Sequence, residues 1–269
     1  FRSDGMSKPL HAAHAAETGV MATIAASKGV TGALDVLEGP AGMGAAMSGN
    51  ANWRKATSGL GKIYNIEAIT FKNHGCCGHT FAAIDGLLFI MEDAQITAND
   101  IANIAITTYG PAVLITDRVD PKTSQECKFS MQYVLAHAAH YGSVRIEAFE
   151  AERMSDPAIQ AMLGQIDLGI DPAVDAEFPA RRAAHVRVTT KDGRQLTHYQ
   201  PTRKGDPDLP LTDDELDAKF VELANPVLGN ELTNSLLQKL WQLDEISLAT
   251  ALDFAVLKRD HAAGKNLAN

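Results

Sequence analysis

Apolar side chains recur with the three- to four-residue spacing of an amphipathic helix near the start of the chain. The pattern predicts a helix from His11 to Ala26, opened by Pro9 and ended by Gly29. Because alanine and other small residues are so frequent there, we expect this helix to pack closely on others and to be buried in a bundle. Two shorter helical segments are expected within residues 32–49 and 53–60.

Helical spacing returns near the end of the chain. Thr212 and Glu215 have the spacing of a capping box, with two further acids between them that suit a helix N-terminus. Leucines repeat on one face of the following segment, which calls for a partner surface, and the first helix is the expected one. Helices are predicted for residues 215–224, 231–243 and 245–258.

The middle of the chain has a different pattern. Residues 64–71 and 101–109 alternate between apolar and polar positions as strands do. Helical spacing separates them, over residues 80–91, and follows them, over residues 129–141. Residues 183–200 contain Asp192-Gly193 between two alternating runs, which predicts a β-hairpin with antiparallel pairing.

This order of elements predicts a mixed fold. We expect an all-α helical domain interrupted by an inserted α+β lid domain that contains the antiparallel hairpin. The predicted boundaries are residues 1–64 for the first helical part, 65–206 for the lid and 207–269 for the return of the helical domain.

Composition excludes several classes of function. The 269 residues carry a formal net charge of −9, and a nucleic-acid partner would require a basic face. The short basic pairs Arg181–Arg182 and Arg203–Lys204 are expected to be solvated surface charge. We expect no membrane partner, because acidic residues interrupt the apolar stretches. Three cysteines favour a reducing compartment, and we expect a cytoplasmic protein.

Two lysines lie where active sites gather. Lys8 precedes the first helix, and Lys72 ends a predicted strand and opens a glycine-containing turn. The alternative is that both are ordinary surface lysines. His11 lies one turn after Lys8, so it would line any cleft that Lys8 lines, or else it packs between helices.

The turn that follows Lys72 contains His74, Cys76, Cys77 and His79 within six residues. Adjacent cysteines are poor ligands for one tetrahedral ion and no second ligand pair follows, so we expect no metal. A cysteine nucleophile beside a histidine is a second possibility. The third is that the cysteines fill space where a turn meets a helix.

Four segments of the chain resemble motifs of the MmgE/PrpD family, in the family's order and over nearly the whole sequence. They are residues 7–20 (SKPLHAAHAAETGV), 29–42 (GVTGALDVLEGPAG), 71–85 (FKNHGCCGHTFAAID) and 129–133 (FSMQY).

The resemblance implies a helical domain, a lid domain with the active site between them, a homodimer and no cofactor. It implies a small polycarboxylate substrate, held by Lys8 and Lys72, from which a proton next to a carboxylate is moved. His74, Cys77 and His79 are the candidates for that proton transfer, and His11 for substrate binding. In the family's decarboxylases a histidine occupies the position of Cys77, so the resemblance leaves dehydration, decarboxylation and epimerisation of an iminodisuccinate-type acid open.

The chain opens at Phe1, in what is expected to be a loop. We therefore expect a further helical segment upstream in the complete protein, one that contributes to the site. Two alternatives to an enzyme remain at this point: a non-catalytic fragment, and a module that binds small anions without turnover.

Overall fold

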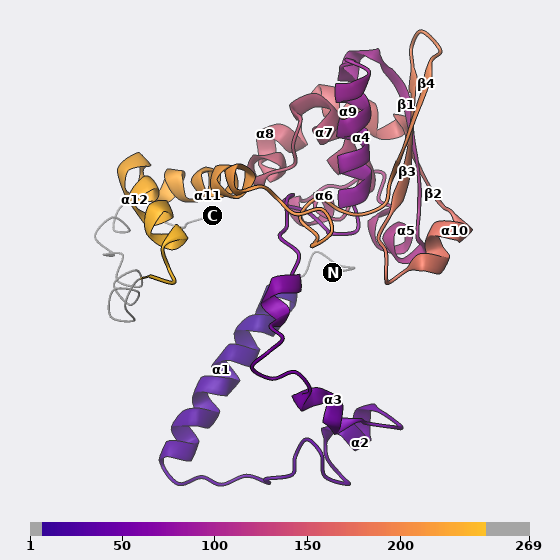
Figure 1. Cartoon of the computed structure of the whole chain (residues 1–269). Coiled ribbons are helices and arrows are strands. Elements are labelled where there is room, and N and C mark those ends of the chain that lie inside the picture. Colours follow the sequence, from indigo (N-terminus) through magenta and orange to yellow (C-terminus); the bar gives the residue numbers. More distant parts are fainter. Residues whose placement is uncertain (1–6, 246–269) are drawn as a thin grey trace. The chain divides into compact units, whose positions relative to one another are not determined.

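The computed structural model describes residues 7–245, and the chain divides into two compact units, residues 1–209 and 210–269 (Figure 1). The predicted domain boundaries at residues 64 and 206 stay a prediction. Of the helix predicted for residues 245–258, all but the first position lies outside the described residues. The elements of the first unit before the sheet are α1 (Ser7–Ser27), α2 (Met43–Met47), α3 (Trp53–Thr57), the 3-10 helix η1 (Asn65–Ala68), α4 (Phe81–Asp93) and the 3-10 helix η2 (Ala98–Asp100).

Helix α1 confirms the predicted helix, but its surroundings differ from the expectation. Its apolar side chains Val20, Met21 and Ile24 are 60%, 62% and 53% exposed. The expectation that this helix is buried in a bundle is therefore wrong for the described chain. An alanine-rich sequence favours the helix itself, whereas its burial depends on a partner surface.

A four-stranded mixed sheet forms the centre of the first unit, in the order β2-β1-β3-β4 (Figure 1). Strand β1 pairs in parallel with β2 and antiparallel with β3, which pairs antiparallel with β4. The chain passes from β1 to β2 through a series of short helices, as a parallel connection requires. The bounds are β1 (Ile101–Thr108), α5 (Gly110–Thr116), α6 (Ser124–Cys127), α7 (Met131–Tyr141), η3 (Ile146–Phe149), α8 (Ala151–Met154), α9 (Pro157–Met162), η4 (Leu163–Gln165), β2 (Ile166–Ile170), α10 (Pro172–Glu177), β3 (Ala184–Thr190) and β4 (Gln195–Gln200).

The predicted hairpin is confirmed as β3 and β4. Gly193 takes a φ of +88° in its turn, a backbone conformation that glycine adopts without steric cost. Two backbone hydrogen bonds to Thr190 close the turn. Gly193 N donates to Thr190 O at 2.9 Å, and Thr190 N donates to Arg194 O at 3.0 Å. The parallel strand β2 was not predicted; its residues alternate, but the run is only five residues long and contains Gly169.

The predicted strand at residues 64–71 is wrong. The structure has the 3-10 helix η1 there, and all eight residues are exposed. An alternating pattern becomes a strand only where a neighbouring strand accepts its hydrogen bonds. Phe71 instead donates one backbone bond to Gly205 O at 2.9 Å.

Helix α4 connects the sheet to the rest of the core. It packs against β3 and β4 on one side and against α7 on the other (Figure 1). Phe81, Ile84 and Leu87 on α4 are completely buried. Gly86 lets the helix approach the sheet closely, because a Cβ at this position would lie 2.8 Å from Val186 Cγ2. This packing fixes the segment just before α4, which carries the candidate site.

The second unit contains α11 (Asp213–Leu228) and α12 (Asn230–Trp241). The predicted capping box is confirmed, since the Thr212 hydroxyl accepts from Glu215 N and the Glu215 carboxylate accepts from Thr212 N. Trp241 Nε1 on α12 donates to Asp217 Oδ1 at 2.7 Å, which links the two helices. None of the helices in the described part of the chain is long and apolar enough to span a bilayer.

Candidate functional site

Four cationic side chains converge on one pocket of about 390 Å³ in the first unit. The turn before α4 forms one wall, and the loop before β3 and the loop after β4 contribute an arginine each. The start of α1 adds Lys8, whose Nζ lies 5.1 Å from the centre of the Phe129 ring. The lining residues are Lys8, Thr70, Lys72, Cys77, Gly78, His79, Phe81, Arg182 and Arg203.

The turn that carries Lys72 and Cys77 is held by backbone hydrogen bonds to the segments that flank α7. Gly75 N donates to Val144 O at 2.8 Å, and Cys77 N donates to Lys128 O at 2.9 Å. Lys72 Nζ donates to Cys76 O at 3.1 Å. A short turn that is anchored in this way presents its side chains in a fixed geometry, as a binding site requires.

His79 is the histidine of the pocket lining. Burial, and after it the positive charges of Arg182, Arg203 and Lys8, together lower the pKa of His79 to about 4. The imidazole is therefore neutral at neutral pH. Its Nδ1 lies 2.8 Å from Tyr109 Oη, and the tautomer decides which of the two atoms donates. Burial raises the pKa of Tyr109, so the phenol keeps its proton.

Arg203 ties three segments of the site together. Its Nε and Nη2 donate to the two carboxylate oxygens of Asp206, at 2.8 and 2.6 Å. Nη2 also lies 3.2 Å from Thr70 Oγ1, and Nη1 donates to Gly78 O at 3.4 Å. Arg203 is only 8% exposed, so the expectation that this arginine is solvated surface charge is wrong. A guanidinium is buried here because a carboxylate partner compensates for its lost hydration.

The thiols of the Cys-Cys pair keep their protons at neutral pH. Burial raises the pKa of Cys76 to about 12 and raises the pKa of Cys77 as well. Cys76 Sγ also lies 3.2 Å from Thr80 Oγ1. A nucleophile needs the thiolate, so these surroundings disfavour the cysteine-nucleophile alternative. Among the described residues, no three His, Cys, Asp or Glu side chains come together as a metal site would need.

Two of the predicted site residues do not line the pocket. His74 is 4% exposed, and its Nε2 lies 3.0 Å from Asp85 Oδ1, while the other oxygen of that carboxylate accepts from Lys204 N at 2.8 Å. This arrangement joins the turn to α4 and to the loop after β4. His11 is exposed on α1. The structure thus brings Lys8, Lys72, Cys77 and His79 together and leaves His11 and His74 outside.

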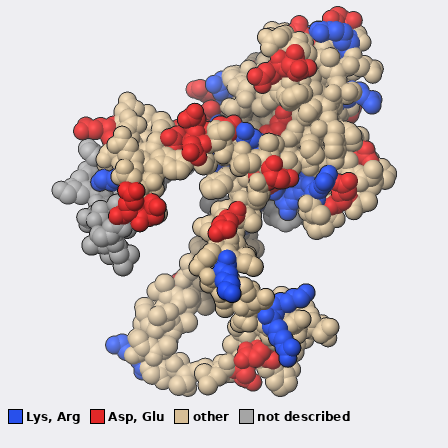
Figure 2. Space-filling view, viewed as in Figure 1, with Lys and Arg blue, Asp and Glu red and all other residues tan. Residues whose placement is uncertain are grey.

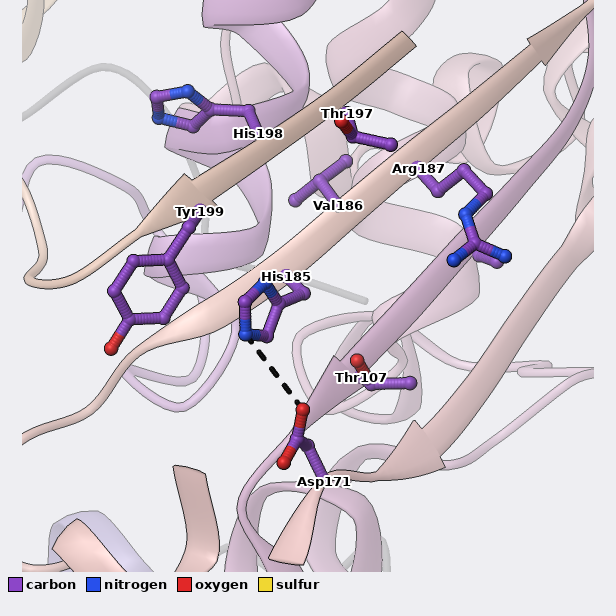
Figure 3. Close-up of a pocket in the computed structure, with 9 residues that line it drawn as sticks. Thr107, Asp171, His185, Val186, Arg187, Thr197, His198 and Tyr199 are labelled. Carbon is purple, nitrogen blue, oxygen red and sulfur yellow. Dashed lines mark ion pairs between the residues drawn. The ribbon is translucent and has the colours of Figure 1, made fainter. Parts of the chain in front are cut away.

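A second pocket, of about 410 Å³, lies on the sheet and is shown in Figure 3. His185 projects from β3 towards Asp171, and the distance between His185 Nε2 and Asp171 Oδ2 is 3.7 Å. The His185 and Asp171 side chains are 50% and 28% exposed. This pocket contains one arginine and no lysine, so it offers an anionic ligand much less positive charge than the pocket around His79 does.

Arg182, Arg203 and Tyr109 are the site residues that the sequence pattern did not identify. Tyr109 lies more than thirty positions after Lys72 in the sequence, and the two arginines lie more than one hundred positions after it. Nothing in their local pattern separates them from surface residues. The face shown in Figure 2 carries acidic and basic side chains in small interspersed groups, so charge density along the chain is a poor guide to this site. Only the meeting of the turn before α4 with the loops around β3 and β4 identifies them.

Comparison with known proteins agrees with the sequence motifs. The chain matches the model of the MmgE/PrpD C-terminal domain over residues 74–243 and that of the MmgE/PrpD N-terminal domain over residues 1–56. It is 27% identical over 256 residues to cis-aconitate decarboxylase of Mus musculus and 25% identical over 254 residues to that of Homo sapiens, covering 91% of this chain in each case. It is 31% identical over 105 residues to 2-methylcitrate dehydratase of Cupriavidus necator, which covers 37% of this chain and 22% of that protein.

The chain spans about half the length of the curated relatives it matches, 52% in both decarboxylases. The C-terminal model alone covers more than half of the chain and includes the turn before α4 from residue 74 onwards, both arginine loops and the sheet. The N-terminal model covers the segment that contributes Lys8. The chain therefore belongs to the MmgE/PrpD family.

Proposed function

We propose that this chain carries the catalytic pocket of a lyase that moves a proton next to a carboxylate group of a small polycarboxylic acid. The observation that carries the proposal is the convergence of Lys8, Lys72 and two arginines around a histidine held neutral. The names of the relatives support it, since a decarboxylase of cis-aconitate and a dehydratase of 2-methylcitrate both act on such acids.

The two lysines serve as carboxylate clamps in this proposal. Lys8 and Lys72 approach the pocket from different segments of the chain, so their ammonium groups can engage different oxygens of one substrate. When a proton leaves the carbon next to a carboxylate, negative charge moves onto the carboxylate oxygens. Fixed ammonium groups stabilise that charge and can contribute several kcal/mol to lowering the barrier, on the order of the effect of an oxyanion hole.

His79 is the proposed proton-transfer group. Its Nδ1 faces the Tyr109 hydroxyl, so Nε2 is the atom that is left to face the substrate. For Nε2 to accept a proton, Nδ1–H must donate to Tyr109 Oη, which fixes both the tautomer and the ring orientation. The pKa of about 4 keeps the imidazole in the unprotonated form over the neutral range, as a general base requires.

Dehydration and decarboxylation place different demands on this arrangement. In dehydration, the base takes the proton next to the carboxylate, the electron pair forms a carbon–carbon double bond, and the β-hydroxyl leaves as water after it gains a proton. In decarboxylation, the bond to one carboxylate breaks, CO₂ leaves, and the electron pair on carbon takes up a proton. The Cys77 thiol, which keeps its proton because burial raises its pKa, is a candidate donor for either protonation.

The test is proton NMR of the intact protein in D₂O with citrate, 2-methylcitrate, cis-aconitate and iminodisuccinate in turn. Deuterium should appear at a carbon next to a carboxylate of at least one acid, and the product identifies the reaction. Loss of water indicates a dehydratase, and loss of CO₂ indicates a decarboxylase. Deuterium exchange that leaves the covalent connectivity of the acid unchanged indicates an epimerase.

The variant His79→Asn should slow this exchange by about 100-fold or more, the usual contribution of a positioned general base. His185→Asn, which removes an imidazole from the other pocket, is the matched control and should leave the rate unchanged. If His79→Asn exchanges deuterium as fast as the wild type, the proposed role of His79 is wrong. If no acid exchanges with the wild type, the proposed function is wrong.

A further inference from the structure

Arg182 differs from the other arginine of the pocket in having no acidic partner among the residues that the structure describes. It follows α10, just before β3, and it is half-buried. The structure places its guanidinium 5.9 Å from the centre of the Phe178 ring and gives it no hydrogen bond or ion pair with any described residue. A guanidinium has five N–H donors in a planar fork that fits a carboxylate. A half-buried guanidinium whose donors have no acceptor among the described residues is therefore suited to bind a carboxylate ligand.

Two aromatic residues lie between Arg182 and His79. The Phe178 ring stacks on the Tyr109 ring, with centroids 4.7 Å apart and planes inclined by 14°. The Tyr109 hydroxyl contacts His79 Nδ1. The Arg182 guanidinium therefore lies beside the same group of aromatic rings that contacts the proposed proton-transfer histidine, so a ligand bound to it lies close to that histidine.

Arg203 does not have the same capacity. Asp206 accepts two hydrogen bonds from it and balances its charge, and Thr70 and Gly78 accept from two more of its five N–H donors. The pocket lining itself contains no Asp or Glu side chain. An anion that enters the pocket thus meets Arg182 as a guanidinium with free donors, in addition to the ammonium groups of Lys8 and Lys72.

We propose that Arg182 binds a carboxylate of the substrate that the two lysines do not hold, and so selects acids with three carboxylates over acids with two. This assignment rests on the proposed function, because it takes the ligand of the pocket to be a polycarboxylate. Arg203 is a positioning residue in this division of roles: it holds the segments that carry Lys72 and His79, while Arg182 contacts the ligand.

Equilibrium binding to the intact protein separates these roles. The probes are tricarballylate, which has three carboxylates and no hydroxyl group to eliminate, and glutarate, which has two carboxylates on a chain of similar length. Calorimetry would measure both dissociation constants for the wild type, Arg182→Gln, Arg182→Lys and Arg181→Gln. Arg181 is the matched control, because its side chain is 61% exposed, does not line the pocket around His79, and lies 3.7 Å from the carboxylate of Glu177.

Arg182→Gln should weaken tricarballylate binding by about 10- to 100-fold and glutarate binding by less than about 3-fold, as expected for the loss of a charge-assisted bidentate contact. Arg182→Lys should recover part of the loss, because it restores the charge without the fork. Arg181→Gln should match the wild type for both anions.

Equal weakening of both anions by Arg182→Gln would show a general effect on the pocket and would overturn the assignment, as would unchanged binding of tricarballylate. In both cases the proposed function survives, because the wild type still binds polycarboxylates. If the wild type binds neither probe, the proposed function fails and the assignment fails with it. Circular dichroism of each variant separates a loss of the contact from a loss of the fold.

Discussion

Replacing Asp206 by asparagine should destabilise the first unit strongly, because it leaves the buried Arg203 guanidinium without a compensating charge. The side chains of Arg203 and Asp206 are only 10% and 13% exposed. Asp206 accepts from Nε and Nη2 of Arg203, and its Oδ1 also accepts from Thr70 Oγ1 at 2.6 Å. An asparagine keeps one acceptor oxygen and turns an NH₂ group towards a donor of the guanidinium.

The expected cost is about 3 kcal/mol, the lower end of the range for breaking a buried ion pair, because both side chains keep some contact with solvent. Urea unfolding followed by far-ultraviolet circular dichroism would measure it. Asp208→Asn is the matched control: this nearby carboxylate is exposed and accepts one hydrogen bond from Thr202 at 2.9 Å. Its loss should cost less than about 1 kcal/mol.

The pH dependence tests the same reasoning independently. Burial by itself would raise the pKa of Asp206, but hydrogen bonds from Arg203 and Thr70 outweigh it and hold the pKa below the ordinary value of 3.8. The stabilisation is therefore complete above pH 3.8, and it is lost as the pH falls through the lower pKa of the folded state. The difference between the wild type and Asp206→Asn should shrink as the solution is acidified through this range.

A double-mutant cycle decides whether the ion pair itself is responsible. The variant Arg203→Met with Asp206→Asn removes both charges, so it should be less destabilised than the sum of the two single variants by at least about 1 kcal/mol. The reasoning is refuted if Asp206→Asn costs no more than Asp208→Asn, or if the two single effects simply add.

Three further predictions follow from individual contacts. The acid limb of the kcat/KM profile should fall near pH 4 rather than near 6.5, because burial and neighbouring cations depress the pKa of His79 and a base must be unprotonated; a limb near 6.5 would contradict the site geometry. Leu87→Ala on the buried face of α4 should cost about 3 kcal/mol in urea unfolding, while Leu114→Ala, with the leucine 71% exposed, should cost less than about 0.5 kcal/mol. Cys77 should react slowly with iodoacetamide until urea unfolds the chain, because burial raises its pKa; rapid alkylation of the folded protein would show a thiolate.

Local chemistry explains which elements could be predicted from the sequence. The hairpin of β3 and β4 was predictable because its turn needs a residue that tolerates a positive φ, and Gly193 supplies it. The start of α11 was predictable because Thr212 and Glu215 satisfy each other's backbone donors within one turn. Each of these arrangements involves residues that are close in the sequence.

The strands that were predicted wrongly or missed have the opposite character. Residues 64–71 alternate as a strand does but meet no neighbouring strand among the described residues, so they remain exposed. Residues 166–170 are a run of only five alternating residues with a glycine among them, yet they form β2 because β1 offers them a parallel edge. Strand formation depends on a partner that can be far away in the sequence, which a local pattern does not specify.

The candidate site divides in the same way. The sequence by itself determined the family motifs and, with them, Lys8, Lys72 and the His-Cys-Cys-His turn as candidates, because these residues are close neighbours in short patterns. Only the tertiary structure decided which histidine faces the pocket, that Arg203 is buried against Asp206, and that Arg182 and Tyr109 belong to the site. The sequence specifies the chemical type of each side chain. The pKa, the burial and the partners of that side chain depend on segments that meet only when the chain folds.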